Sequence, residues 1–216
     1  MRLLLRRKGN DETMKVALLV PPSRTLTQRL PIGIMQLSGC LDVAGIENVI
    51  VDIKGSKNAR QEALQSIYDA APDVLGITCC ATEVHEVRKI CEETKSRLPR
   101  LQIVLGGPHP SNSPEHFADV NYDFIIQGEG EISLPRLIAD IQRGQDTPTR
   151  ISRGIAVNDL DALPYPAYEK INLEYYARPS AWAIRPVYLS SLQIFGSRGC
   201  PYSCSFCVAD TIFGKK

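Results

Sequence analysis

The sequence has 216 residues, of which 44% are hydrophobic and 23% are charged, and its formal net charge is +1. This composition is typical of a globular protein, and a charge so close to zero without long basic runs argues against a nucleic-acid-binding surface. No apolar stretch is long enough to span a bilayer, and the N-terminus lacks the apolar core of a signal peptide. We therefore expect a cytoplasmic protein in which residues 1–13 form an N-terminal tail.

Strand-like and helix-like patterns alternate from Lys15 to about Gly144. Short apolar runs predict five strands, at Lys15–Val20, Asn48–Asp52, Val74–Thr78, Gln102–Leu105 and Phe124–Ile126. A proline-rich loop, Pro21 to Pro31, follows the first strand. Apolar residues at helical spacing predict four helices, at about Ile34–Ala44, Ala63–Ala71, Val84–Leu98 and Leu134–Ile141, and a shorter one near Pro114–Ala118. This order predicts an α/β fold: a five-stranded doubly wound parallel sheet of the Rossmann-like kind, over residues 14–144.

The loops after strands one, three, four and five are expected at one edge of that sheet, where open α/β sheets bind ligands. Two of these loops are rich in glycine, which lets a backbone come close to a bulky ligand. Neither the dinucleotide fingerprint nor the phosphate-binding loop follows the first strand, so the two common nucleotide folds are poorly supported.

The regular pattern ends after Gly144. Residues 145–191 are read as a linker, because their centre, Asp159 to Pro166, is acidic and rich in proline. Leu192–Phe195 then predicts one more strand, and it leads directly into a cysteine-rich loop.

The seven cysteines fall into two groups. Four lie in or beside apolar periodic segments and are expected to be small buried side chains: Cys40, Cys79, Cys80 and Cys91. The other three, Cys200, Cys204 and Cys207, have the spacing C-x-x-x-C-x-x-C, which suits three irons of a 4Fe–4S cluster and leaves the fourth iron open. A structural zinc site would need a fourth cysteine or histidine nearby, and none follows; a chance spacing is the other alternative.

This loop resembles the cluster loop of radical SAM enzymes, with Phe206 as its aromatic residue. The flanking Ser197-Arg198-Gly199-Cys200-Pro201 looks like the version found in members with an N-terminal cobalamin domain. Upstream segments are similar to that domain as well. These segments are Pro31-Ile32-Gly33, Asp52, Pro72 to Thr78, Leu105 to His109, Asp123 to Glu131, and Asp159 to Pro164. The resemblance covers about residues 14–216.

The resemblance implies three cofactors: cobalamin, a 4Fe–4S cluster on Cys200, Cys204 and Cys207, and S-adenosylmethionine, which is cleaved reductively for methyl transfer or ring formation. It also implies a small-molecule or biosynthetic substrate and an electron donor such as a flavodoxin or ferredoxin, with no nucleic acid or membrane partner. The expected cobalamin contacts are Thr78, Gly106, Gly107, His109, Gly128 and Gly130. The D-x-H-x-x-G signature of histidine-ligated cobalamin is absent, so we expect His109 to be a hydrogen-bonding loop residue.

Several alternatives stay open. Glu129 and Glu131 suit either the start of the next helix or a cofactor contact, and His85 and His116 are expected at the surface. A radical SAM barrel takes roughly 250 residues, whereas residues 192–216 supply only its start, so we expect a fragment with a poorly packed C-terminal segment. The competing functions are a cobalamin-binding or cofactor-free module without activity, and a generic receiver-like domain.

Overall fold

The computed structural model describes residues 13–22, 29–53, 59–145, 149–178, 190, 192–202 and 204–214. The expected N-terminal tail therefore lies outside the described residues except for Thr13. Parts of the proline-rich loop and of the linker also lie outside them. Within the described ranges, no helix is both long and apolar enough to cross a membrane.

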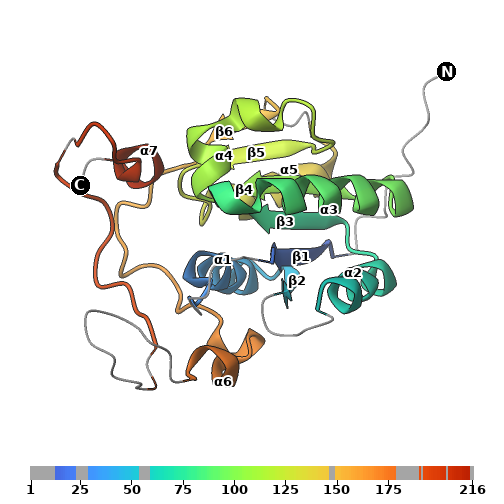
Figure 1. The fold of residues 1–216 in the computed structure, drawn as a ribbon, viewed down its shortest axis with the longest axis horizontal. Helices are drawn as coiled ribbons and strands as arrows, with labels where there is room; N and C mark the ends of the chain where they lie inside the picture. Colours follow the sequence, from blue (N-terminus) through green and yellow to red (C-terminus); the bar gives the residue numbers. More distant parts are fainter. Residues whose placement is uncertain are drawn as a thin grey trace.

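Six parallel strands form one sheet in the order β2-β1-β3-β4-β5-β6 (Figure 1). They are β1 Lys15–Val20, β2 Glu47–Asp52, β3 Val74–Thr78, β4 Gln102–Gly106, β5 Phe124–Gln127 and β6 Ile151–Arg153. The central strands are buried along nearly their whole length, as their continuous runs of valine, leucine and isoleucine predict.

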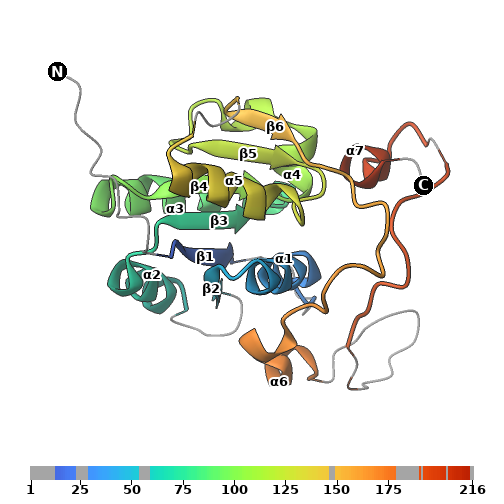
Figure 2. The same ribbon diagram turned by 180° about the vertical axis from the view of Figure 1, so that it is seen from behind.

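Helices cover both faces of the sheet, which confirms the doubly wound α/β prediction. One apolar cluster packs α2 (Ala59–Ala70) and α3 (Val84–Arg97) on one face, and a second packs α1 (Ile32–Val43) and α5 (Ser133–Arg143) on the other. Figure 1 shows α3 in front of the sheet, and Figure 2 shows α5 on the reverse side. The shorter elements are η2 Ala81–Glu83, α4 Pro108–Asn112, η3 Pro114–Phe117, η4 Tyr168–Lys170, α6 Leu173–Tyr176 and α7 Ala209–Phe213.

The sheet has one strand more than the sequence predicted. β6 lies within the expected linker and pairs with β5, Ile125 being opposite Ile151. Its three residues are too few to show a period, and two of them are exposed, so the pattern gave no strand signal. It pairs with the free edge of β5, and that edge exists only once the rest of the sheet has formed.

The predicted strand at Leu192–Phe195 is wrong, because these residues form no strand. Ile194 is 81% exposed and Phe195 is 63% exposed. A short apolar run needs a neighbouring strand to satisfy its backbone groups, and no described strand lies beside this one.

The part of the expected linker from Pro164 to Tyr176 packs along α1 and the β2 edge rather than crossing open surface. Gln36 donates a hydrogen bond to the Pro164 carbonyl at 2.6 Å, and the Ala167 amide donates to the Met35 carbonyl at 3.0 Å. Gly39 allows this approach, because a Cβ there would lie 2.5 Å from the Tyr165 carbonyl oxygen.

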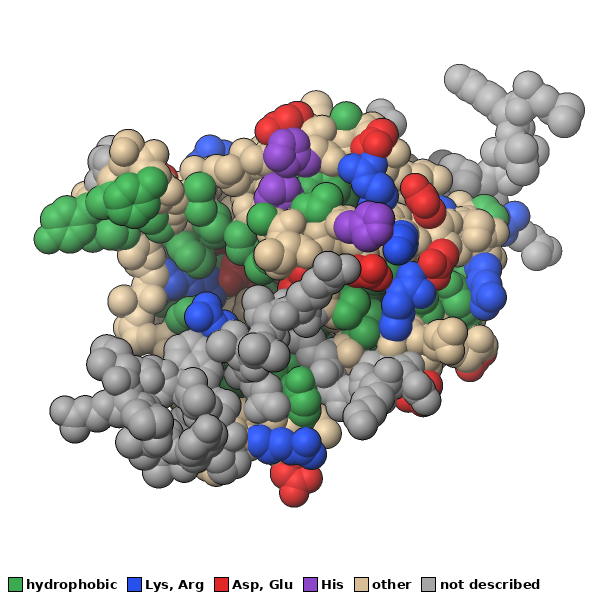
Figure 3. Space-filling model, in the orientation of Figure 1, with side chains coloured by type: hydrophobic (Ala, Val, Ile, Leu, Met, Phe, Trp, Pro, Cys, Tyr) green, Lys and Arg blue, Asp and Glu red, His purple; other side chains and the backbone are tan. Residues whose placement is uncertain are grey.

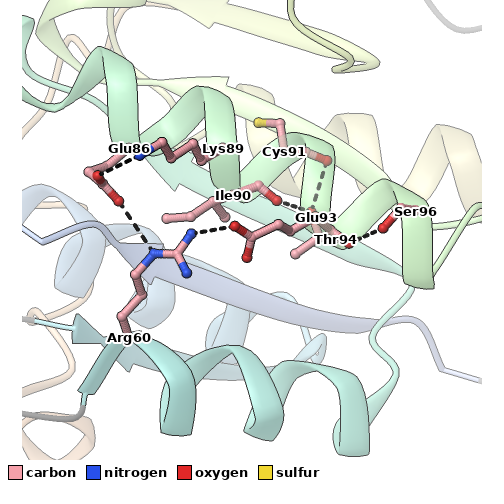
Figure 4. A network of polar contacts seen from close by, with 8 residues as sticks. All are labelled: Arg60, Glu86, Lys89, Ile90, Cys91, Glu93, Thr94 and Ser96. Carbon is pink, nitrogen blue, oxygen red and sulfur yellow. Dashed lines mark hydrogen bonds and ion pairs between the residues drawn. The ribbon is translucent and has the colours of Figure 1, made fainter.

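On the opposite face, Arg60 joins α2 to α3 (Figure 4). Its guanidinium lies 2.7 Å from Glu93 and 3.3 Å from Glu86. Both carboxylates belong to α3, so this contact joins two helices that share an apolar cluster.

Candidate functional site at the carboxyl edge of the sheet

A cavity of about 590 Å³ lies at the carboxyl ends of the strands. The strand order reverses between β1 and β3, so the cavity stands at the position where ligands bind in open α/β sheets. Its size is within the range of small-molecule and cofactor sites, and its wall is mostly apolar. The residues from the strand ends that line it include Val20, Thr78, Gly106, Gly107, Gly128 and Gly130.

Gly107 brings the β4 loop against the β3 loop. Its φ is +90° and its ψ −175°, a conformation open essentially to glycine alone. A Cβ there would also lie 2.5 Å from Thr78 Oγ1. The Cys79 amide donates to the Gly106 carbonyl at 2.9 Å, and the His109 amide donates to the Cys79 carbonyl at 3.0 Å. The floor of the cavity is therefore backbone held in one arrangement.

The loop after β5 is tied to α4 by Ser111. The Gly128 amide donates to Ser111 Oγ at 2.8 Å, and Gln127 Nε2 donates to the Ser111 carbonyl at 2.9 Å. Ser111 Oγ in turn donates to the Gly107 carbonyl at 2.7 Å. One buried serine thus links the glycine-rich loops after β4 and β5.

The C-terminal segment supplies another wall of the cavity. Phe195, Arg198, Ile212 and Phe213 line it together with the strand ends. Figure 1 shows α7 (red) beyond the arrowheads of the strands, and Figure 3 shows hydrophobic side chains gathered at that end of the molecule. Gly128, with a φ of +86°, gives α7 room, because a Cβ there would lie 3.0 Å from the Ile212 carbonyl oxygen.

Arg198 makes a buried ionic contact in this wall. Its Nη1 lies 2.6 Å from Glu131 Oε1 and 3.3 Å from Glu129 Oε1. The remaining carboxylate oxygen of Glu129 accepts a hydrogen bond from the Val157 amide at 2.8 Å. α5 begins at Ser133 without a side-chain cap, so these two glutamates hold the C-terminal segment rather than capping the helix, and both also line the cavity.

Five of the six expected cobalamin contacts line the cavity: Thr78, Gly106, Gly107, Gly128 and Gly130. The sixth, His109, does not line the cavity. Its Nε2 lies 3.1 Å from His116 Nδ1, and its ring packs edge-on against Phe117. Partial burial and the neighbouring imidazole lower the pKa of His109. His85 and His116 are exposed, as expected.

The cysteines divide much as their spacing predicted. Cys40, Cys79 and Cys91 are buried, but Cys80 is exposed and lines the cavity, so that part of the prediction is wrong. Cys80 is the second residue after β3 and follows the buried Cys79, where the chain turns out of the core.

The three thiols of the C-terminal loop are free. Cys200 is half-buried, Cys204 and Cys207 are exposed, and the Cys207 amide donates to the Cys204 carbonyl at 3.0 Å. Among the described residues, no three His, Cys, Asp or Glu side chains are close enough together to hold a metal ion. The loop therefore has the donor set for a cluster without having its thiols gathered.

Sequence reasoning missed the contributions of Arg198, Ile212 and Phe213 to the cavity. Arg198 stood in a quoted motif, but nothing in its spacing showed that it would meet glutamates almost 70 residues earlier. A buried arginine needs a buried acid, so the two glutamates of the glycine-rich loop were the available signal.

Comparison with known proteins agrees with this geometry. The family model for the B12 binding domain matches residues 27–138, just over half of the chain. An uncharacterized methyltransferase of Pyrococcus horikoshii is 24% identical, with 95% of this chain and 47% of that protein covered. The cobalamin-dependent radical SAM methyltransferase TokK of Streptomyces tokunonensis is 30% identical, with 68% and 23% covered.

Among solved structures, the radical S-adenosylmethionine methyltransferase TsrM of Kitasatospora setae, with cobalamin and a [4Fe-4S] cluster bound, has the same fold. The TM-score is 0.64 at 18% identity, over 95% of this chain and 44% of that one. The chain thus spans less than half the length of each of these relatives. With the match to residues 27–138 and a cavity at the expected edge of the sheet, the chain belongs to the B12 binding domain family.

Proposed function

We propose that the chain binds cobalamin in the cavity at the carboxyl edge and holds a 4Fe–4S cluster on Cys200, Cys204 and Cys207. In this proposal it is part of a cobalamin-dependent radical SAM enzyme that transfers a methyl group or forms a ring. The observation that carries the proposal is that the segment bearing the three cysteines forms one wall of the same cavity.

The residues present fit a large, flat organic ligand. Gly106 and Gly107 offer backbone without side chains on one side, and the strand ends and α1 offer apolar surface. Leu37 lies so near Gly130 that a Cβ there would be 3.1 Å from it. Thr78 adds a hydroxyl to the lining. Bound there, cobalamin would supply a cobalt centre able to carry a methyl group, and this chain would bind it, orient it and exclude water from it.

The three thiols fit a cluster by their chemistry, because three thiolates leave one iron free for S-adenosylmethionine. Such a cluster would supply one electron for the cleavage, received from a donor such as a flavodoxin or ferredoxin. The substrate would be a small or biosynthetic molecule. We propose no nucleic-acid or membrane partner, and the cytoplasmic location stays a prediction.

A second function is favoured by one observation: the three thiols are not gathered into a site among the described residues. On that view the chain is a cobalamin-binding module, and it has no activity of its own.

Anaerobic reconstitution with iron, sulfide and hydroxocobalamin, followed by counting of cobalt, iron and sulfide, tests both. We expect cobalt and cluster on the full chain, and loss of iron with retention of cobalt in Cys204→Ala. Cys80→Ala removes another exposed thiol and is the matched control that keeps its iron. Cobalt without iron in the unaltered chain would favour the binding module, and a chain that takes up neither would contradict the proposal.

A further inference from the structure

Arg198 meets two carboxylates in a place from which water is largely excluded. The side chain of Arg198 is 10% exposed, and those of Glu129 and Glu131 are 3% and 7% exposed. Both contacts come from Nη1 of Arg198, so one nitrogen bridges the two carboxylates, and hydrogen bonds between charged groups are stronger than neutral ones.

Glu129 is anchored beside the end of β6, whereas Arg198 comes from the C-terminal segment. Glu129 accepts a hydrogen bond from the Val157 amide. Its carbonyl is packed so closely on Gly154 that a Cβ there would lie 1.9 Å away. Between the two glutamates, the Gly130 carbonyl accepts a hydrogen bond from the Leu134 amide at 2.8 Å. The loop that carries both carboxylates is therefore held without Arg198, and the arginine is the part that docks.

The cysteine loop itself is weakly held. Tyr202 and Phe206 are 73% and 88% exposed, so they add little burial around the cysteines. Arg198 lies two residues before Cys200, and its partners lie in the loop that also forms the cavity wall. The position of the cysteine loop relative to the cavity then depends on this contact before it and on the packing of α7 after it.

The charge of Arg198 is needed where the segment covers these carboxylates. Replacing Arg198 by an uncharged side chain would leave two neighbouring carboxylates buried without that cation, and breaking a buried pair from one side is far more unfavourable than removing both partners.

We infer that Arg198 is a positioning residue: it clamps the cysteine loop onto the Glu129 and Glu131 loop and so sets the placement of the cluster ligands over the cobalamin cavity. This inference rests on the proposed function for what the two sites hold, but the clamp itself is a property of the unloaded chain.

Hydrogen exchange measured by mass spectrometry on the full chain tests the clamp without any cofactor. In Arg198→Met we expect the hydrogen-bonded amides of 204–214, those of Cys207, Thr211, Ile212 and Gly214, to exchange roughly tenfold faster or more, while those of β1, β3 and β4 keep the unaltered rate. Arg100→Met makes the same change at an exposed turn residue and should leave all rates unchanged. Arg198→Lys, which keeps the charge on a shorter side chain, should give an intermediate rate.

A double variant separates the clamp from a general loss of packing. Adding Glu131→Gln to Arg198→Met removes one of the stranded carboxylates, so the melting temperature should rise again relative to Arg198→Met alone. If the losses in melting temperature of Arg198→Met and Glu131→Gln simply add in the double variant, the clamp is overturned. Unchanged exchange of 204–214 in Arg198→Met would overturn it equally.

The loaded protein supplies a second readout. Because Ile212 and Phe213 line the cavity, hydroxocobalamin should slow exchange of 204–214 in the unaltered chain, and by linkage Arg198→Met should bind hydroxocobalamin more weakly. A chain that binds no cobalamin yet loosens in Arg198→Met would refute the proposed function and keep the clamp. Cobalamin bound equally tightly by Arg198→Met, with no change in exchange, would refute the clamp and keep the proposed function.

Discussion

The hydroxyl of Tyr176 donates a hydrogen bond to the carboxylate of Asp52. Tyr176 belongs to α6, and Asp52 closes β2 at the edge of the sheet. Tyr176 is buried with Leu30, Ile32 and Met35 in an apolar cluster of its own. Nearby, Lys170 lies 2.6 Å from Asp42. These contacts hold the segment between the sheet and the cysteine loop against α1.

Replacing Tyr176 by phenylalanine should reduce the free energy of unfolding by about 1–2 kcal/mol, because the hydrogen bond to Asp52 is lost while the ring stays in place. Urea denaturation followed by circular dichroism measures the change. Tyr165→Phe removes a hydroxyl from a side chain that is 91% exposed, and it should leave the stability unchanged. Equal effects in the two variants would contradict a specific role for the buried hydroxyl.

The same hydroxyl predicts a pH dependence. Burial raises the pKa of Tyr176, and the Asp52 carboxylate raises it further. Since the folded state favours the neutral phenol, the contribution to stability is complete below the ordinary pKa of 10.0 and falls as the pH rises above it. Denaturation at pH 8 and pH 11 should show a loss in the unaltered chain, and a smaller one in Tyr176→Phe.

The sequence predicted the parts of the fold that depend on local periodicity. β1 and β3 begin and end where their apolar runs do, and Gly45 follows α1 with a φ of +71°, as its place after the helix suggested. The ligand edge followed from the parallel order, because strands that run the same way bring their loops together.

What the sequence could not show depends on contacts distant along the chain. β6 exists because the edge of β5 accepts it, and Leu192–Phe195 is not a strand because no described strand accepts it. Likewise, Glu129 and Glu131 have their role only because Arg198 reaches them. The sequence could therefore predict the cavity residues in the glycine-rich loops. It could not predict that the C-terminal segment forms another wall of the cavity.

Gly107→Ala should weaken cobalamin binding and stability together. Its backbone conformation alone disfavours a side chain by roughly 1–3 kcal/mol, and the overlap with Thr78 and the Cys79 amide adds roughly 1–3 kcal/mol. Gly144→Ala is the matched control, because its φ is also positive, at +62°, but open space surrounds it. Titration with hydroxocobalamin should show weaker binding only for Gly107→Ala. Unchanged binding there would mean that the β4 loop does not contact the ligand.

The contacts of Arg60 should matter little for stability and not at all for binding. The side chains of Arg60, Glu86 and Glu93 are 32%, 28% and 44% exposed. Ion pairs at such positions contribute about 0.5 kcal/mol each. Arg60→Met should therefore lower the free energy of unfolding by about 1 kcal/mol at low salt and by less at high salt. A large loss that salt does not reduce would show that Arg60 acts through packing of α2 on α3.

Alkylation of the native chain by iodoacetamide at pH 8 should divide the cysteines by burial and locate the cobalamin. Burial raises the pKa of Cys91 to about 12 and also raises that of Cys79, so neither forms the reactive thiolate in the folded state. Cys80, Cys204 and Cys207 are exposed and should react first. Because Cys80 lines the cavity and the other two do not, hydroxocobalamin should protect Cys80 selectively. Peptide mass spectrometry reads each site, and protection of Cys204 without Cys80 would place the ligand outside the carboxyl edge of the sheet.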